Sequence, residues 1–375
     1  MKIDKKHLLN YSILIPYLIL SVLGLIVVYS TTSPTSIQAG GNGFGMVLNQ
    51  GIFWIISLFI IALLYRIRLS FLKKGGILTM VIFAEIILLL LSRFITGTIN
   101  GAHGWLKLGA FSIQPAEYLK IILVWYLAFR FTKRQEEIKV YDYQALTHNH
   151  WFPKAFNDWR TMVAILIGIV AIMPDLGNAT ILFLTVVIMI AVSGIGYRWF
   201  STMLGAIVSV SGLVLTSIWI IGVERVAKIP VFGYVAKRFS AFFNPFKDLS
   251  GSGHQLANSY YAMSNGGWFG LGLGNSIEKR GYLPEAHTDF VFSIVIEEFG
   301  FFGASLILAL LFFLILRIIL VGIRAKNPFN SMMALGIGGM ILMQTFINIG
   351  GISGLIPSTG VTFPFLSQGG NSLLV

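Results

Sequence analysis

The sequence predicts an all-α polytopic membrane protein. Its 375 residues are 56% hydrophobic and only 11% charged, whereas soluble domains carry about 25% charged residues. The mean hydropathy is +0.80. The apolar residues fall in runs of about 20, which is the length of a helix that crosses a bilayer. Because a helix satisfies its own backbone polar groups in lipid, runs of this length indicate membrane-spanning helices.

Ten apolar runs follow one another along the chain. The fifth and sixth are short and are divided by Pro174-Asp175-Leu176-Gly177, and a polar interruption at 223–289 separates the seventh from the eighth. The tenth begins near Thr362 and stops at Val375. We therefore expect a single transmembrane domain over 1–375, with a large loop at 223–289 and a truncated tenth helix. The runs cover 8–30, 46–65, 76–96, 115–131, 160–173, 178–197, 199–222, 290–320, 331–350 and 362–375.

The distribution of Lys and Arg predicts the orientation. Most of the 27 basic residues lie in segments that are cytoplasmic if the N-terminus is cytoplasmic, as the positive-inside rule requires. The loop at 223–289 is then extracellular. This distribution and contact with lipid headgroups account for the net charge of +12, so we expect no nucleic-acid partner. The first run is too long for a cleavable signal and lacks a convincing cleavage site, so we expect it to remain as the first span.

Several chemistries are excluded by composition. The chain has no cysteine, which rules out disulfides and thiolate metal sites. It also has no Gly-x-x-x-x-Gly-Lys phosphate loop, so its work is not driven by its own ATP hydrolysis.

Four carboxylates fall inside the apolar runs, where an ionisable side chain costs about 2.5–3.5 kcal/mol at a helix centre. Glu117 and Lys120 are one helical turn apart at the outer start of the fourth run. They can pair on one face, either as a helix-end ion pair or as part of a site. Glu297 and Glu298 point about 100° apart on a helix, so at most one of them faces a narrow interior site. For these two and for Glu85, structural pairing is the favoured interpretation.

The loop at 223–289 mixes polar and apolar residues too finely for a disordered linker. Its glycines between Gly266 and Gly274 allow the backbone to approach a ligand or a neighbouring helix closely. The basic and aromatic stretch from Arg225 to Phe243 lies either along the outer membrane surface or in a solvated loop with buried aromatic residues.

Asp289 stands where this loop enters the eighth run, and it has two compatible interpretations. It can cap the helix, and a carboxylate that the helix N-terminus holds ionised can serve as a general base at the edge of an outward-facing cavity. If 285–289 is extended, Glu285, His287 and Asp289 share one face; if it is helical, Glu285 and Asp289 do. One histidine and two carboxylates lack a second ligand pair at metal spacing, so we expect no metal site.

A set of motifs lies in order over nearly the whole chain. They are Asn100-Gly101-Ala102-His103-Gly104-Trp105-Leu106, Gln114-Pro115-Ala116-Glu117 with Lys120, Pro174-Asp175-Leu176-Gly177, Gly266-Gly267-Trp268-Phe269-Gly270, Pro284-Glu285-Ala286-His287-Thr288-Asp289-Phe290, Gly354-Leu355-Ile356-Pro357 with Thr359-Gly360, and Pro364-Phe365-Leu366-Ser367-Gln368-Gly369-Gly370. With these motifs the chain resembles the SEDS family of polytopic membrane proteins (shape, elongation, division and sporulation). The element from Pro284 to Phe290 is highly specific, whereas the glycine stretches alone are not. Gly272-Leu273-Gly274-Asn275-Ser276, followed by Lys279, Arg280 and Tyr282, resembles the division branch more than the elongation branch.

The resemblance implies ten transmembrane helices, a large extracellular loop between the seventh and eighth, and both termini inside the cell. It implies a peptidoglycan glycosyltransferase that polymerises lipid II, the undecaprenyl-pyrophosphate-linked disaccharide-pentapeptide. Such a protein works in the plasma membrane at the division septum, with a class B penicillin-binding protein and other divisome proteins. The family's essential aspartate falls on Asp289, and its glutamate and lysine fall on Glu117 and Lys120. We also expect the substrate to contact Glu285, His287, Gln255, Asn275 and Ser367.

The chain departs from the family pattern at three places. Gly104 stands where the family often has an arginine before the tryptophan, which removes an anion contact. Gln368 replaces the tyrosine of the usual Ser-Tyr-Gly-Gly. The tenth span and its cytoplasmic tail are incomplete at Val375, which bears on stability and activity.

The expected reaction is an inverting glycosyl transfer. Asp289 takes the proton from the 4-hydroxyl of the acceptor sugar as that oxygen attacks the anomeric carbon of the donor, and undecaprenyl pyrophosphate leaves. Lys120, a basic loop residue or a divalent cation such as Mg²⁺ or Mn²⁺ balances the leaving charge, and we expect no other cofactor.

Two alternatives to this reaction remain. One is a lipid II flippase, because buried charge in a polytopic bundle also suits a transporter. The other is a scaffold that only recruits the penicillin-binding protein. The sequence shows no clear inverted repeat, and its polar motifs gather on one face, so catalysis is favoured.

Overall fold

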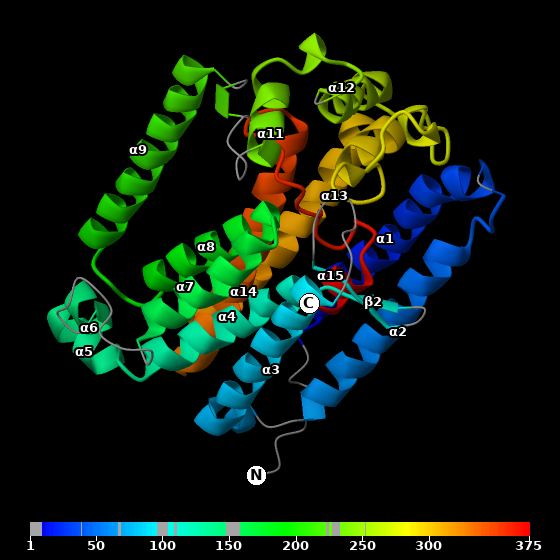
Figure 1. Ribbon diagram of the computed structural model, residues 1–375. Helices are drawn as coiled ribbons and strands as arrows, with labels where there is room; N and C mark the ends of the chain where they lie inside the picture. The colour runs from blue at the N-terminus through cyan, green and yellow to red at the C-terminus, as the bar shows by residue number, and fades with distance from the viewer. Residues whose placement is uncertain are drawn as a thin grey trace. The chain divides into compact units, whose positions relative to one another are not determined.

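The computed structural model describes residues 10–38, 40–66, 69–95, 104–108, 111–147, 158–222, 225–226, 233–251 and 253–375. Within these ranges the chain is mainly helical (Figure 1). The helices are α1 (Tyr11–Gln38), α2 (Gly45–Arg66), α3 (Gly75–Phe94), α4 (Pro115–Thr132), α5 (Gln135–Tyr141), α6 (Tyr143–Thr147), α7 (Trp159–Ile172), α8 (Leu176–Ala191), α9 (Tyr197–Ile221), α11 (Gly233–Phe243), α12 (His254–Gly266), α13 (Val291–Arg324), α14 (Pro328–Ile352) and α15 (Gly370–Leu374), with 3₁₀ turns η2 (Leu69–Lys73), η3 (Pro245–Lys247) and η4 (Glu278–Arg280).

Most of the apolar runs form the expected helices. Among the described residues, six helices are long and apolar enough to cross a membrane, namely α1, α2, α3, α9, α13 and α14. The shorter apolar helices α7 and α8 cover the fifth and sixth runs. Helix α4 begins at Pro115, as expected, because proline suits the first helical position. The ends of two runs, at 8–9 and at 96, lie outside the described residues.

Aspartates cap the helices of the fifth and sixth runs, and Asp175 lies at the break between them. Asp158 accepts a hydrogen bond from Arg160 N at 2.9 Å before α7, and Asp175 accepts one from Asn178 N at 3.1 Å before α8. Each carboxylate satisfies a backbone N–H group that has no partner within its helix. Helix α8 ends at Ala191, earlier than the sixth run predicts, and Gly194 follows with φ +96.

The chain forms two compact units. Unit 1 comprises Met1–Trp54, Thr202–Leu314 and Gln344–Gly370, and unit 2 comprises Ile55–Ser201, Ile315–Met343 and Asn371–Val375. The single transmembrane domain over 1–375 stays a prediction.

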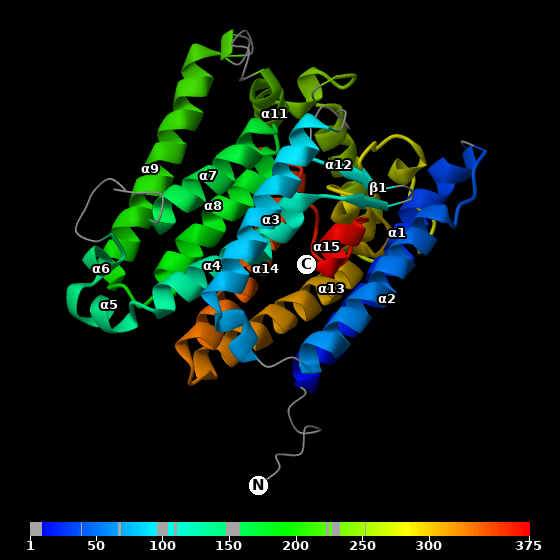
Figure 2. The same ribbon diagram turned by 60° about the horizontal axis from the view of Figure 1, so that its bottom comes forward.

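In unit 2, helices α3, α4, α7 and α8 pack against one another (Figure 2). Helix α4 contributes Leu119, Leu123 and Leu127, whose side chains are fully buried. Glycines on α14 allow close packing here, because a Cβ at Gly336 would collide with the side chains of Val124 and Met189. Such small residues are typical of helix contacts in membranes, where backbones approach closely.

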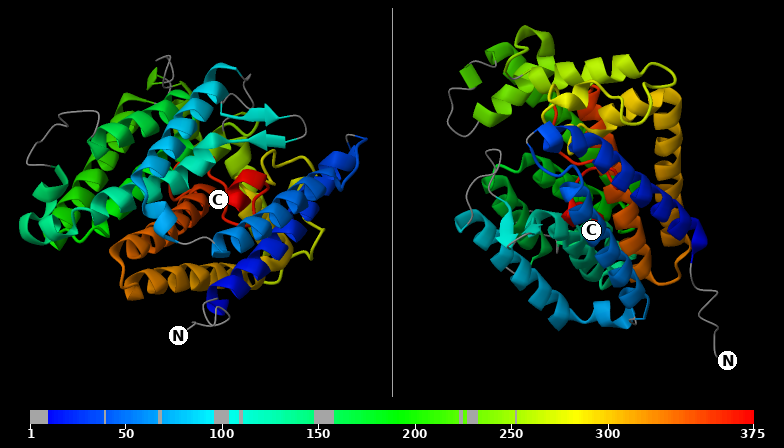
Figure 3. Two further views of the ribbon diagram at one scale, coloured as in Figure 1. Left: turned by 90° about the horizontal axis from the view of Figure 1, so that it is seen from below. Right: turned by 90° about the vertical axis from the view of Figure 1, so that its right-hand side faces the viewer.

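In unit 1, the interruption at 223–289 contains ordered elements where it is described, namely α11, η3, α12 and η4 (Figure 3). Helix α12 packs against η3, α11 and η4, and η4 also packs against α1. The stretch from Arg225 to Phe243 is helical from Gly233, while 227–232 lies outside the described residues. The extracellular location of this segment stays a prediction.

Two details differ from the sequence-based expectations. A short antiparallel hairpin of β1 (Leu106–Leu108) and β2 (Phe111–Ile113) is added to the all-α fold, with Leu106 opposite Ile113. The run from 362 to 375 is helical only in α15, because Pro364 and the left-handed backbone of Phe365, with φ 64, interrupt it. The first motif is described only from Gly104, since Asn100 to His103 lie outside the described residues.

Candidate functional site

Asp289 lies at the end of a series of tight turns that leads into α13. Thr288 N and Phe290 N both donate to the carbonyl oxygen of Glu285, at 3.2 and 3.1 Å. The segment 285–289 is therefore neither extended nor helical, and neither arrangement considered from the sequence applies. Helix α13 begins at Val291, so the carboxylate precedes the helix by two residues.

A small pocket, partly open to solvent, lies beside Asp289. It is lined by the start of α13, the last turns of α14 and the segment 358–361. Gly360, with φ +76, forms part of its wall. A Cβ at this position would lie 3.2 Å from Asp289 Oδ2 and 3.1 Å from Arg238 Nη2. A carboxylate and a guanidinium therefore approach the same glycine.

Arg238 comes from α11 and is anchored by the segment that carries Gly360. Its Nη1 donates to the carbonyl oxygen of Ser358. This hydrogen bond joins residues that are 120 positions apart. It holds the guanidinium against Gly360, close to Asp289.

Asn348, near the end of α14, supports the backbone of Asp289. Its Nδ2 donates to the carbonyl oxygens of Asp289 and Val361, at 2.7 and 2.6 Å. The residue is 4% exposed, and its Oδ1 is buried without a hydrogen-bond partner. Asn348 also lines the pocket.

The turn at 363–368 holds the chain before Asp289. Ser367 Oγ donates to the carbonyl oxygen of Thr288 and accepts from Phe363 N, both at 2.7 Å. Gln368 N donates to the carbonyl oxygen of His287, also at 2.7 Å. The hydroxyl of Ser367 is thus engaged with the protein backbone, and its predicted contact with substrate stays a prediction.

Glu285 and His287 belong to the same series of turns as Asp289. Glu285 Oε2 accepts a hydrogen bond from Thr288 Oγ1 at 2.6 Å. Burial lowers the pKa of His287, and the nearby Glu285 carboxylate offsets part of this effect. A half-buried histidine of lowered pKa is neutral near pH 7. One of its ring nitrogens can then donate a hydrogen bond and the other can accept one.

Gln255 and Asn275 occupy other parts of unit 1. Gln255 is half-buried near the start of α12. Asn275 is exposed, and its Nδ2 donates to the carbonyl oxygen of Leu271 at 3.0 Å, which closes a turn. Neither residue lines the pocket beside Asp289, and their contact with substrate stays a prediction.

The predicted pair of Glu117 and Lys120 is confirmed in unit 2. Lys120 Nζ lies 2.8 Å from Glu117 Oε2, and both side chains are buried in the first two turns of α4. Glu85 on α3 is also buried, and its Oε1 has no hydrogen-bond partner among the described residues. The pairing with another span that the sequence suggested for Glu85 is therefore not observed for this oxygen.

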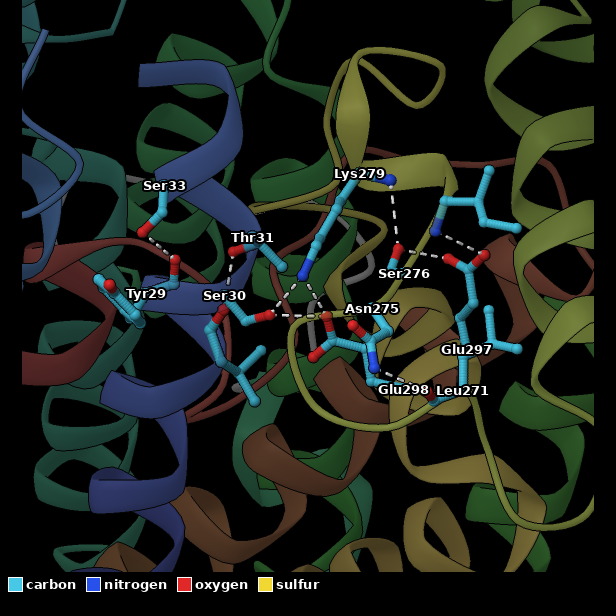
Figure 4. A network of polar contacts seen from close by, with 12 residues as sticks. Tyr29, Ser30, Thr31, Ser33, Leu271, Asn275, Ser276, Lys279, Glu297 and Glu298 are labelled. Atoms are coloured by element: carbon cyan, nitrogen blue, oxygen red, sulfur yellow. Dashed lines mark hydrogen bonds and ion pairs between the residues drawn. The ribbon is translucent and has the colours of Figure 1, made fainter. Parts of the chain in front are cut away.

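Glu297 and Glu298 are both buried in unit 1 and bind different partners (Figure 4). Lys279 Nζ pairs with Glu298 Oε1, and Ser30 Oγ accepts from Lys279 at 2.7 Å while donating to Glu298 at 2.6 Å. Glu297 accepts hydrogen bonds from the Ser276 hydroxyl and, at 3.1 Å, from Asn265 Nδ2. The structural interpretation of the two glutamates is confirmed.

These two glutamates stand beside a break in α13 at Gly300, which has φ 69 and ψ 179. The glycine-rich loop fills the break: Leu271 N donates to the Glu297 carbonyl at 2.9 Å, and Phe301 N donates to the Gly267 carbonyl at 2.9 Å. A Cβ at Gly270 would overlap the backbone of Glu298 and Gly300. Of the two roles that the sequence left open for these glycines, close approach to a neighbouring helix is observed.

Sequence reasoning missed Arg238 and Asn348 as site residues. Arg238 was one of several basic residues in a loop, and nothing local distinguishes it. Asn348 did carry a signal, because an amide inside the apolar run 331–350 is costly unless it is satisfied or functional. Among the described residues, no cluster of three histidine, aspartate or glutamate side chains is placed to hold a metal ion.

The whole described chain matches one known family. Residues 11–375 match the profile of the cell cycle proteins FtsW, RodA and SpoVE. The chain belongs to this family. The SEDS resemblance that the motifs predicted is thus confirmed. Together with the six long apolar helices, FtsW/RodA/SpoVE membership makes the chain a multi-pass membrane protein.

Two relatives within the FtsW/RodA/SpoVE family are similar over nearly the full length. The probable peptidoglycan glycosyltransferase FtsW of Lactococcus lactis subsp. lactis (strain IL1403) is 47% identical, over 100% of this chain and 91% of the relative. The protein of the same description from Bacillus subtilis (strain 168) is 37% identical, over 98% of this chain and 87% of the relative.

Two solved structures show the same fold as this FtsW/RodA/SpoVE member. One is a chain from work on the structural coordination of polymerization and crosslinking by a peptidoglycan synthase complex, with a TM-score of 0.73, 23% identity, and coverage of 97% of this chain and 93% of that chain. The other is the rod shape determining protein RodA of Thermus thermophilus, with a TM-score of 0.64, 21% identity, and coverage of 97% and 92%.

Proposed function

We propose that this chain is a peptidoglycan glycosyltransferase that polymerises lipid II into glycan strands during septal wall synthesis. Its relatives described as probable peptidoglycan glycosyltransferases support the activity. The structural observation that carries the proposal is the approach of the Asp289 carboxylate and the Arg238 guanidinium to Gly360, which forms part of the wall of the pocket beside Asp289. This arrangement sets a base beside a positive charge, which glycosyl transfer from a diphosphate donor requires.

Asp289 acts as the general base in this proposal. It removes the proton from the 4-hydroxyl of the acceptor sugar as that oxygen forms a bond to the anomeric carbon of the donor. The bond from that carbon to the phosphate oxygen breaks, and undecaprenyl pyrophosphate leaves with the electron pair. Among the described residues, those that line the pocket include no second carboxylate. A direct displacement with inversion therefore fits better than a covalent glycosyl intermediate, which needs a carboxylate nucleophile in addition to the acid or base.

Positive charge stabilises the leaving diphosphate. Arg238, whose guanidinium lies against Gly360 beside Asp289, supplies it. Lys120, paired with Glu117 in unit 2, is the candidate that the sequence suggested for the same role. A divalent cation would supply further positive charge, because Mg²⁺ is bound mainly by substrate phosphates with few protein ligands.

We place the active site on the outer side of the plasma membrane at the division septum, in a protein of ten spans with a cytoplasmic N-terminus. The distribution of Lys and Arg supports this orientation. We expect a class B penicillin-binding protein and other divisome proteins as partners. The similar chain from a peptidoglycan synthase complex supports association with a crosslinking partner.

The proposal is tested with the purified full chain, its cognate penicillin-binding protein and fluorescent lipid II, without ATP. Wild-type protein is expected to produce glycan ladders on a gel. The Asp289→Asn variant keeps the side-chain shape and loses the base, so it should fold normally and produce no ladders. Wild-type turnover in this variant would contradict the assignment of Asp289 as the general base. Well-folded wild-type complex that makes no ladders would overturn polymerisation, and a vesicle assay of lipid II translocation would then test transport.

A further inference from the structure

Asn348 has one hydrogen-bonding group that the protein does not use. Its two amide protons are directed at the carbonyl oxygens of Asp289 and Val361, at 2.7 and 2.6 Å. Carbonyl oxygens only accept hydrogen bonds, so the contacts themselves determine which side-chain atom is nitrogen. The other atom must be Oδ1, which is an acceptor.

This oxygen is buried but not satisfied. Asn348 is 4% exposed, and Oδ1 has no partner among the described residues. Buried polar atoms nearly always have a partner, and the exceptions call for an explanation such as a bound ligand. Asn348 lines the pocket beside Asp289, so a ligand bound there would lie against this side chain.

A hydrogen-bond donor that arrives with the ligand can pair with Oδ1. An anion such as a phosphate would be repelled by a carbonyl oxygen. The hydroxyl whose proton moves to Asp289 cannot donate to Asn348 at the same time. A second hydroxyl on the same sugar has the required chemistry, because it can donate a hydrogen bond while remaining neutral.

We propose that Asn348 binds the acceptor sugar, with Oδ1 accepting a hydrogen bond from a hydroxyl that flanks the reacting one. This inference rests on the glycosyltransferase function proposed above and adds a binding residue to it. Nδ2 holds the backbone of Asp289 while Oδ1 holds the sugar that Asp289 deprotonates. One amide therefore sets the distance between the base and the reacting hydroxyl, which is the kind of positioning that accelerates a transfer.

The test combines protein variants with altered acceptors in a coupling assay. The donor is labelled lipid II that lacks its own 4-hydroxyl, so it can donate but cannot accept. The acceptor is unlabelled lipid II, or analogues that lack the 3-hydroxyl or the 6-hydroxyl of the reacting sugar. Because the labelled product keeps the pyrophosphate of the acceptor and can donate again, the initial rate of formation of labelled products of all lengths gives the relative kcat/KM for each acceptor, with the purified full chain and its penicillin-binding protein.

Wild type is expected to use one of the two deoxy acceptors about tenfold less efficiently than the natural one, which corresponds to one lost hydrogen bond. Asn348→Ala should lose activity with the natural acceptor and show no more than about a twofold further loss with that deoxy acceptor. Such non-additivity is the sign of a direct interaction. Asn348→Ser, whose hydroxyl is shorter, should behave in the same way.

Gln344→Ala is the matched control. Gln344 Nε2 donates to the carbonyl oxygen of Thr362 at 3.0 Å, so it supports the same segment as Asn348, but it does not line the pocket. This variant should keep the roughly tenfold preference of wild type. The inference is overturned if wild type uses both deoxy acceptors as well as the natural one, or if the Asn348 variants keep the wild-type preference. Failure of wild type with the natural pair would instead overturn the proposed function.

Discussion

Ser367 Oγ donates a hydrogen bond of 2.7 Å to the carbonyl oxygen of Thr288, the residue directly before Asp289. The same oxygen accepts from Phe363 N at 2.7 Å. One hydroxyl therefore joins the turn at 363–367 to the chain that carries the carboxylate. Because Ser367 is only 2% exposed, water does not readily replace this hydroxyl if it is removed.

Ser367→Ala is expected to lower both stability and activity. The change leaves the Phe363 N–H group and the Thr288 carbonyl without a buried partner, and each such group costs about 1–3 kcal/mol. The polymerisation rate should fall by at least about tenfold at temperatures where the variant is folded, since small displacements of a catalytic group are costly. Thermal unfolding and the ladder assay measure the two effects. Ser201→Ala, at an exposed serine of α9, is the control, and equal behaviour of the two variants would contradict the positioning role of Ser367.

The buried pair of Lys279 and Glu298 should show strong coupling. Both side chains are 1% exposed, so Lys279→Met alone leaves a buried carboxylate that is no longer neutralised, at a cost of about 3–5 kcal/mol. Adding Glu298→Leu should recover much of that loss, because no unpaired charge remains. Free energies of unfolding for the single and double variants give the coupling energy.

An exposed pair in the same chain provides the comparison. Lys139 and Glu136 have the same charges, with side chains that are 66% and 87% exposed. Removing Lys139 should cost less than about 1 kcal/mol, because water screens the pair. If Lys279→Met lowers the free energy of unfolding by no more than Lys139→Met does, burial does not make the pair of Lys279 and Glu298 more important for stability than the exposed pair.

The sequence predicts the local features of this protein well, namely the positions of its long helices and contacts within one helix. The lengths of apolar runs locate α1, α2, α3, α9, α13 and α14, because a bilayer imposes one length on every span. The pairing of Glu117 with Lys120 follows from a spacing of three residues on one helix. Asp289 stood out because it lies where the loop enters the eighth run, within the specific element from Pro284 to Phe290.

The remaining contacts of the site join residues that are far apart in sequence. Asn348 contacts Asp289 across 59 positions, and Ser367 contacts Thr288 across 79. No periodicity encodes such pairs, because they depend on how separate segments pack. The prediction of a helix over the tenth run was wrong for a different reason. The composition of this run is apolar, but the backbone at Pro364 and Phe365 is incompatible with a continuous helix.

Gly300→Ala is expected to be one of the most destabilising single substitutions in unit 1. Gly300 has φ 69, and a Cβ there would overlap the backbone of Phe269 and Gly270. The variant must separate the glycine-rich loop from α13, so we expect a loss of about 2 kcal/mol or more from strain and lost contacts. Gly205→Ala is the control, since a Cβ at Gly205 in α9 meets nothing within 4 Å, and alanine favours a helix over glycine by about 1 kcal/mol. Similar melting temperatures for the two variants would contradict the tight fit at the break.

His287 should make the stability of the protein depend on pH in one direction. Burial lowers its pKa below the usual 6.5, so at a pH between the lowered value and 6.5 the unfolded chain binds a proton that the folded chain does not. The free energy of unfolding therefore rises with pH across this window. The contribution of neutral His287 to stability is fully present above pH 6.5 and is lost as the pH falls through the window. Melting curves from about pH 7.5 down to about pH 5.5 should show a larger loss of stability for wild type than for His287→Gln, which has no imidazole to protonate. Parallel slopes for the two proteins would show that His287 is equally protonated in the folded and unfolded chains.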